Sequence, residues 1–256
     1  MELQQVIDHV ESLLKGRVLD GWEIMAGESR NLSIEVKDQK VDTFRCSAPM
    51  GVSVRLLKGE GLGFSFSTSM ADADLVEMID NALVGAATQT PDRFNGLPES
   101  LPIPQLPGLY DETLGTVSEE AKISRAMELE RLTLAADPRL KRVRKSSYGE
   151  SDYSVALRNS HGVSAGYRGS SVSASIAVIA ESGGDSQMGW DFGFSCRFDG
   201  VDVARIAAEA ARKATALLGA ETIPTMRCPA LLDNHVAGEI LGVLAPSFLA
   251  ESVQKG

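Results

Sequence analysis

Three side chains near the end of the chain have the types and spacing of metal ligands. Asp233 precedes His235, and His235 and Glu239 are four residues apart, so a helix would place the last two on one face. Carboxylate and imidazole groups are ligands that zinc accepts, so this set is a candidate metal site. The competing interpretation is structural, because Asp233 or Asn234 stands where a helix N-cap belongs. H-x-x-x-E is a weak pattern, so the cap is favoured.

Other reactive residue types favour structural interpretations. Ser160 and His161 are adjacent, but they fall in a predicted turn over residues 159–162, and no acid stands at a spacing that would orient the histidine. A glycine series lacks the spacing of a phosphate loop and is assigned to a hairpin (Gly59, Gly61 and Gly63). The cysteines are odd in number and far apart, which excludes a disulfide framework and predicts buried, reduced thiols (Cys46, Cys196 and Cys228).

Composition narrows the class of protein. Hydrophobic residues make up 43% and charged residues 23% of the 256 residues, which is typical of a globular protein. The formal net charge is −10 and only residues 141–145 are locally basic, so no nucleic-acid partner is expected. The chain starts without a basic and apolar leader, and no apolar run reaches membrane-spanning length. We therefore expect a cytoplasmic protein without a membrane partner.

The first part of the chain predicts a helix, a strand, an antiparallel hairpin and a second helix. Apolar residues recur at helical spacing over 2–15, then alternate at strand period over 32–36, 52–56 and 62–66. Ser69 and Asp72 form a predicted capping box for a helix whose buried face runs from Leu75 to Ala86. Residues 91–109 then hold five prolines and predict a semi-extended connector.

The second part repeats this plan. Thr116 and Glu119 predict a capping box for a helix through Ala136, and a second helix is predicted over 201–218 with Leu217 on its buried face and a Glu209–Lys213 pair. Between them, strands are predicted over 141–147, 153–159, 172–178 and 190–194. The aromatic residues of the last strand are assigned to the core (Trp190, Phe192 and Phe194).

The last 35 residues do not repeat this order of helices and strands. They predict a short strand over 230–232 and a helix from Asp233 to Pro246, too little to bury a core. The predicted fold class is α+β, with two helix-flanked, mainly antiparallel sheet units followed by the start of a β-rich C-terminal domain. The predicted domains are 1–108 with the connector, 109–221, and an incomplete 222–256.

Five segments resemble the TldD/PmbA family, also called modulators of DNA gyrase. They match in order and spacing over essentially the whole chain (51–57 with 63–69, 159–168, 171–180, 204–218 and 228–256). Family members continue into a large β-rich domain, so the resemblance implies that this chain is a truncated form. It also implies a cytoplasmic peptidase complex that cleaves small or unfolded peptides, in peptide-antibiotic maturation or antitoxin turnover.

Catalytic members of the family carry an H-E-x-x-x-H zinc motif, with a later cysteine completing the site. When Gly238 is placed on the family glycine before the motif, Gly242 and Ser247 stand at the histidine positions and Val243 at the glutamate position. The resemblance therefore implies the TldE/PmbA branch: a subunit without a cofactor of its own, whose partner is a TldD-like catalytic subunit that holds the zinc. Heterodimers, heterotetramers and self-association all remain open.

Two rival functions stay open beside this one. The chain can be a stand-alone peptide-binding or regulatory protein, or an autonomous metallopeptidase that uses Asp233, His235 and Glu239. In either peptide-binding case, an extended peptide can add as a strand to an exposed sheet edge, which we expect in the hairpins of the first part.

Overall fold

The computed structural model describes residues 2–100, 102–104 and 106–255, and it divides into two compact units, Met1–Gly219 and Ala220–Gly256. The described residues of the first unit form one antiparallel seven-stranded sheet in the order β4-β3-β1-β5-β6-β7, with β2 also paired to β1. The predicted α+β class is confirmed. In chain order the elements are α1 (Leu3–Leu14), β1 (Gly21–Lys37), β2 (Lys40–Ser47), β3 (Met50–Lys58), β4 (Gly61–Ser67), α2 (Asp72–Thr88), η1 (Leu114–Thr116), α3 (Glu119–Ala135), β5 (Leu140–Asn159), β6 (Ser164–Ser182), β7 (Asp185–Ser195), η2 (Phe198–Gly200) and α4 (Val203–Ala216).

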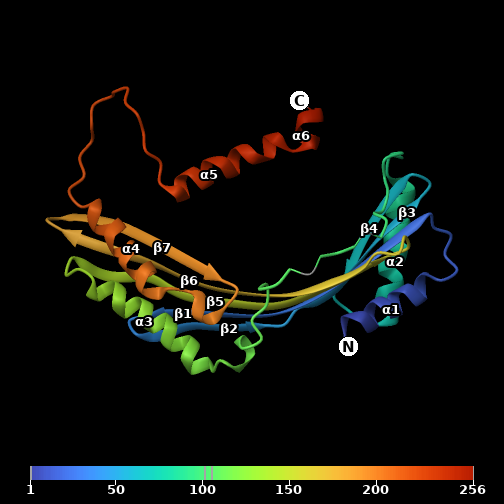
Figure 1. Cartoon of the computed structure of the whole chain (residues 1–256), viewed down its shortest axis with the longest axis horizontal. Helices are drawn as coiled ribbons and strands as arrows, with labels where there is room; N and C mark the ends of the chain where they lie inside the picture. Colours follow the sequence, from blue (N-terminus) through green and yellow to red (C-terminus); the bar gives the residue numbers. More distant parts are fainter. Residues whose placement is uncertain (1, 101, 105, 256) are drawn as a thin grey trace. The chain divides into compact units, whose positions relative to one another are not determined.

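Two separate cores lie along this one sheet. One contains α1, α2 and the first half of β1, and the other contains α3, α4 and the second half of β1. Strand β1 contributes Ile24 and Ala26 to the first core and Leu32, Ile34 and Val36 to the second. All five residues have even numbers, and alternate residues of a strand share a face. Both helix pairs therefore cover the same face of the sheet, one pair at each end of the long strands (Figure 1).

The continuity of the sheet corrects one feature of the prediction. The strands predicted at 141–147 and 153–159 are one strand, β5, and it pairs with β1 from Glu23 to Val36. The middle of β5 shows no alternation in burial, because residues 149–158 are all partly buried. The division into domains at residues 108 and 221 stays a prediction.

Both predicted capping boxes are wrong by two residues. The N-cap of α2 is Ala71, and Ser69 instead accepts a hydrogen bond from the Ala71 main-chain N–H. The N-cap of α3 is Ser118, whose hydroxyl accepts from the Ala121 N–H at 3.2 Å. The predicted cap Thr116 lies in η1. Ser and Thr residues are common near helix starts, so the local pattern identifies the region better than the residue.

The aromatic series of β7 forms a strand, as predicted, but it is not core. Trp190 is 46% and Phe194 is 76% exposed, and both lie on the face of the sheet opposite the helices. The helix-facing positions of β7 are Gly189, Asp191 and Gly193. A Cβ atom at Gly189 would lie 2.3 Å from the Ala210 carbonyl oxygen, so α4 packs too closely to accept aromatic rings there.

Two details of α4 also differ from the prediction. Leu217 is 48% exposed, and the predicted Glu209–Lys213 pair does not form. Lys213 instead contacts the buried carboxylate of Asp191 at 2.9 Å, while Glu209 pairs with Arg212. An unpaired buried carboxylate costs more free energy than a solvated one. Lys213 therefore pairs with the buried Asp191 and not with the partly exposed Glu209.

The connector is fastened to the sheet through Asp111. Its Oδ1 accepts hydrogen bonds from the Thr113 N–H at 2.9 Å and hydroxyl at 2.6 Å, and its Oδ2 accepts from the Phe198 N–H. The Asp111 N–H donates to the Ser170 hydroxyl of β6 at 2.8 Å. The carboxylate thus ties the connector to η2, while its main chain ties it to β6.

Replacing Asp111 by asparagine is expected to lower the free energy of unfolding by about 2 kcal/mol, because a buried charged acceptor is lost. The hydrogen bond from the Thr113 hydroxyl, followed by those from main-chain N–H groups, holds the pKa of Asp111 below its usual range. A lowered folded-state pKa gives stability that is complete at neutral pH and is lost as the pH falls through that pKa. Urea unfolding of both proteins at neutral and at acidic pH should show the difference shrinking with acid. A difference that stays constant would contradict this assignment.

In the second unit, α5 (Asn234–Leu244), η3 (Ala245–Phe248) and α6 (Ala250–Lys255) are helical. The helix predicted from Asp233 is confirmed, but the strand predicted at 230–232 is wrong. No helix formed by the described residues has the length and apolar character needed to cross a bilayer. The burial predicted for the cysteines is also wrong: Cys46 and Cys228 are exposed and Cys196 is partly exposed.

Candidate functional site

Two adjoining cavities lie over the middle of the sheet, between the two helix pairs. Their volumes are about 520 and 400 Å³, and they share the lining residues Arg30, Ala48 and Asp152. We refer to them together as the central groove. It occupies the stretch where β1, β5 and β6 pass from one core to the other.

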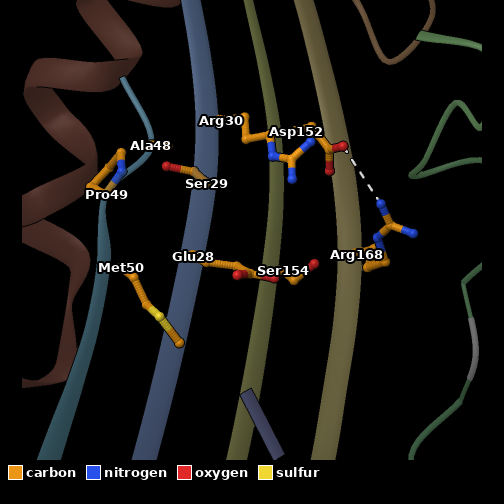
Figure 2. A pocket seen from close by; sticks show the side chains of 9 residues that line it. All are labelled: Glu28, Ser29, Arg30, Ala48, Pro49, Met50, Asp152, Ser154 and Arg168. Carbon is orange, nitrogen blue, oxygen red and sulfur yellow. Dashed lines mark ion pairs between the residues drawn. The ribbon is translucent and has the colours of Figure 1, made fainter. Parts of the chain in front are cut away.

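The sheet register places charged side chains in the groove. In β1 the apolar series at even positions is interrupted by Glu28 and Arg30, which stand between Ala26 and Leu32. Glu28 is paired across the strands with Ser154, and Arg30 with Asp152. Paired residues of an antiparallel sheet share a face, so these four side chains converge on the helix-bearing face (Figure 2).

A second cluster extends the groove onto β6. The Arg168 guanidinium lies 3.5 Å from the Asp152 carboxylate, as the dashed line in Figure 2 shows, and it donates to the Tyr110 hydroxyl at 2.6 Å. It also lies over the Tyr110 ring, 4.0 Å from the centroid. Asp152 therefore has a cation beside it from β6, and the connector is held against the groove by Tyr110.

The smaller cavity contains a nearly buried ion pair. Lys122 of α3 donates to Glu150 of β5 at 2.6 Å, and the Tyr148 hydroxyl donates to the other Glu150 oxygen at 2.6 Å. Burial, and then the hydrogen bond to Glu150, raise the pKa of Tyr148 well above its usual range. Both carboxylate oxygens of Glu150 thus have donors, and the tyrosine stays neutral at physiological pH.

The groove has the features of a binding surface. Its described lining residues include both signs of charge, with Arg30 and Glu28 exposed and Asp152 and Arg168 paired. They include one thiol, Cys46, and no histidine that would activate it. The arrangement can hold a ligand that carries donors, acceptors and charges of both signs.

Among the candidate metal ligands, Asp233 has a structural role. The Asp233 carboxylate accepts the His235 N–H at 2.9 Å, so the N-cap interpretation is confirmed. Across residues 2–100, 102–104 and 106–255, no group of three or more His, Cys, Asp or Glu side chains could hold a metal ion. Gly242 and Val243 lie in α5 and Ser247 in η3; their correspondence to the zinc motif stays a prediction.

The structure also separates Ser160 from His161. The Ser160 hydroxyl accepts the Trp22 N–H at 3.0 Å, whereas His161 Nδ1 lies 3.3 Å from the Leu97 carbonyl oxygen. The turn between β5 and β6 is confirmed, and each side chain has a structural partner there.

The central groove was not predicted from the sequence. One signal was present: two charged residues, Glu28 and Arg30, interrupt an otherwise apolar series at every second position from Ile24 to Val36. Asp152 and Arg168 gave no such signal. Asp152 reaches the groove because β5 pairs with β1, and Arg168 reaches it because β6 pairs with β5.

Family models and known proteins match this chain over most of its length. Two family models match: PmbA/TldA metallopeptidase domain 1 over residues 22–86, and the PmbA/TldA metallopeptidase central domain over residues 112–218. The chain is 24% identical to the metalloprotease PmbA of Escherichia coli O157:H7, over 99% of this chain and 56% of the relative. It spans about half the length of such relatives.

Solved structures share the fold. A candidate modulator of a DNA gyrase from Thermotoga maritima matches with a TM-score of 0.84 and 19% identity, over 99% of this chain and 57% of that one. TldE from Thermococcus kodakarensis matches with a TM-score of 0.71 and 20% identity, over 83% and 47% of the two chains. Two family models in chain order, with a relative aligned along nearly the whole sequence, show that the chain belongs to the PmbA/TldD metallopeptidase family.

Proposed function

We propose that this chain is a PmbA/TldE-like, non-catalytic subunit that binds peptides for a TldD-like zinc peptidase in the cytoplasm. The observation that carries the proposal is the composition of the helical segment around α5. On the family register, Gly242, Val243 and Ser247 stand at the positions of the zinc ligands and the general base. Glycine and valine side chains provide no ligand atom, and a serine hydroxyl is not among the usual zinc ligands.

The histidine count supports the same conclusion. The chain contains His9, His161 and His235, and no two of them have the spacing of H-E-x-x-x-H. In this proposal the zinc-activated water is held by another subunit, and this chain contributes binding surface. The central groove provides such a surface, since its mixed charges suit the amides and charged groups of a peptide.

The test is co-expression of this chain with a TldD-like protein from the same genome. Each protein alone and the co-purified complex are assayed for zinc content and for cleavage of a short, disordered, internally quenched peptide. We expect the two proteins to elute together, with zinc and cleavage following the TldD-like subunit. In the complex, we expect cleavage to be unchanged by His235→Ala.

Two outcomes would replace the proposal. Stoichiometric zinc in the isolated chain that is lost in His235→Ala would establish the autonomous metallopeptidase with Asp233, His235 and Glu239. Peptide binding by the isolated chain, without association with any TldD-like protein, would establish the stand-alone binding protein.

A further inference from the structure

Strand β6 is longer than its partner β7, which leaves part of its edge open. The pairing of β6 with β7 ends at Val172, opposite Ser195, while its pairing with β5 continues to Ser164. Residues 164–169 therefore have a strand on one side only. Sheet edges of this kind present unpaired N–H and C=O groups and are sites where another strand can pair.

The direction of the free groups follows from the hydrogen bond at the end of the open segment. The Ser170 N–H points away from β5, since it donates to the Leu109 carbonyl of the connector at 2.8 Å. Main-chain groups of alternate residues point to the same side, and the β5–β6 register is unbroken here. The N–H and C=O groups of Ser164, Gly166 and Arg168 thus point outward, and no described residue pairs with them there.

The connector forms the opposite wall of a cavity along this edge. The cavity has a volume of about 720 Å³, within the range of ligand sites, and its connector side is apolar (Ile103, Pro104, Leu106 and Leu109). The described connector residues 102–104 and 106–109 form no strand, and three of them are prolines that lack an N–H (Pro102, Pro104 and Pro107). Among the described residues, none pairs with the outward main-chain groups of Ser164, Gly166 and Arg168, so the edge keeps hydrogen-bonding capacity beside its own chain.

We infer that the open edge of β6 at residues 164–169 binds one extended peptide segment as an added strand, with its apolar side chains against the connector. This inference rests on the proposed function for the class of ligand, and it places the added strand on β6 instead of the predicted hairpin edges. Six residues of strand span roughly 20 Å, enough for a peptide of similar length.

The geometry favours a single strand over a second copy of the chain. Both walls of the cavity belong to the same molecule, so a strand can enter whereas the edge of another sheet would meet the connector. Among the described residues that line the cavity, Arg168 is the one that carries a charge. We therefore expect the bound segment to be apolar, and neutral or acidic opposite Arg168.

The experiment uses proline as a selective block. Proline is tolerated at the first residue of a strand and at edge positions whose N–H faces outward, so Ser164→Pro with Arg168→Pro should preserve the β5–β6 pairing. The matched control is Ser164→Ala with Arg168→Ala, which keeps both N–H groups. The probe is a capped, fluorescent peptide of alternating threonine and valine residues, and binding is followed by anisotropy.

We expect the alanine pair to weaken binding about threefold or less, and the proline pair to weaken it about 30-fold, since two main-chain hydrogen bonds are lost. Thermal unfolding and co-purification with the TldD-like subunit should be similar for both pairs. If the proline pair unfolds, N-methylated probes on the unaltered chain replace it: methylation of one alternating set of amides should abolish binding, and methylation of the other set should be tolerated.

Equal effects of the two methylation patterns, or equal binding by the alanine and proline pairs, would overturn the inference, as would no binding of the probe at all. Dissociation of a dimer by the proline pair, without a change in probe binding, would assign the edge to a second copy instead. Association with a TldD-like subunit is measured separately, so its failure counts against the proposed function and leaves the result at the β6 edge intact.

Discussion

Replacing Gly63 by alanine is expected to lower the free energy of unfolding by about 3 kcal/mol, a large share of the stability of a domain of this size. A Cβ atom at Gly63 would lie 1.7 Å from the Ala82 carbonyl oxygen and 2.7 Å from the Ala86 main-chain nitrogen. Both contacts are with the backbone of α2, which cannot move aside as a flexible side chain would. Strand β4 must therefore separate from α2, opening the core of α1, α2 and β3.

The matched control is Gly85→Ala, on the other side of the same contact. A Cβ atom there would meet the Gly63 Cα at 3.5 Å, an ordinary van der Waals distance. Glycine inside a helix costs about 0.5–1 kcal/mol relative to alanine, so this variant should be neutral or more stable. Urea unfolding of the three proteins measures both effects. If Gly63→Ala is as stable as the parent protein, the close packing of β4 on α2 is wrong.

Replacing Glu130 by alanine is expected to cost about 3 kcal/mol. Glu130 lies in α3, is 1% exposed, and accepts three hydrogen bonds from the turn between β1 and β2. The donors are the Asp38 N–H at 2.9 Å, the Gln39 N–H at 2.7 Å and the Gln39 side-chain amide at 2.8 Å. Removal of the carboxylate leaves two main-chain donors without their acceptor in a turn where both residues have positive φ.

Two further variants distinguish the stability that comes from the Glu130 hydrogen bonds from any effect of the substitution on helix α3 itself. Glu128→Ala removes an exposed glutamate two residues away in α3 and should change stability by less than about 0.5 kcal/mol. Glu130→Gln keeps the size of the side chain but replaces one acceptor oxygen with a donor, so an intermediate loss is expected. Similar stability of Glu130→Ala and Glu128→Ala would show that the turn does not depend on this carboxylate.

These two positions show how far the sequence could be interpreted. Gly63 was correctly placed in a hairpin, but the reason for a glycine lies in α2, whose backbone fills the space of a side chain. Glu130 appeared as one of several acidic residues on a predicted helix. Its role depends on a turn about 90 residues earlier in the chain, and nothing in its neighbours indicates that contact.

The candidate site was less predictable than the fold. Asp233, His235 and Glu239 could be recognised as candidate ligands because they lie close together in the sequence. The structure confirms the alternative interpretation of Asp233, which is the N-cap of α5. The central groove is lined by β1, β5 and β6, and its lining residues on β1 are more than 100 positions away from those on β5 and β6. Only the pairing of these strands brings Arg30 opposite Asp152 and Asp152 beside Arg168.

The sequence by itself determined most of the helices and strands in their order, the α+β class and the resemblance to the family. All of these depend on periodicity or on order along the chain. The tertiary structure decided that one sheet carries two cores, that the β7 aromatics face away from the helices, and that an edge of β6 is open. The physical reason is that helix and strand periodicity depends on residues close together in the sequence. Strand pairing depends on contacts between segments that are far apart in the sequence.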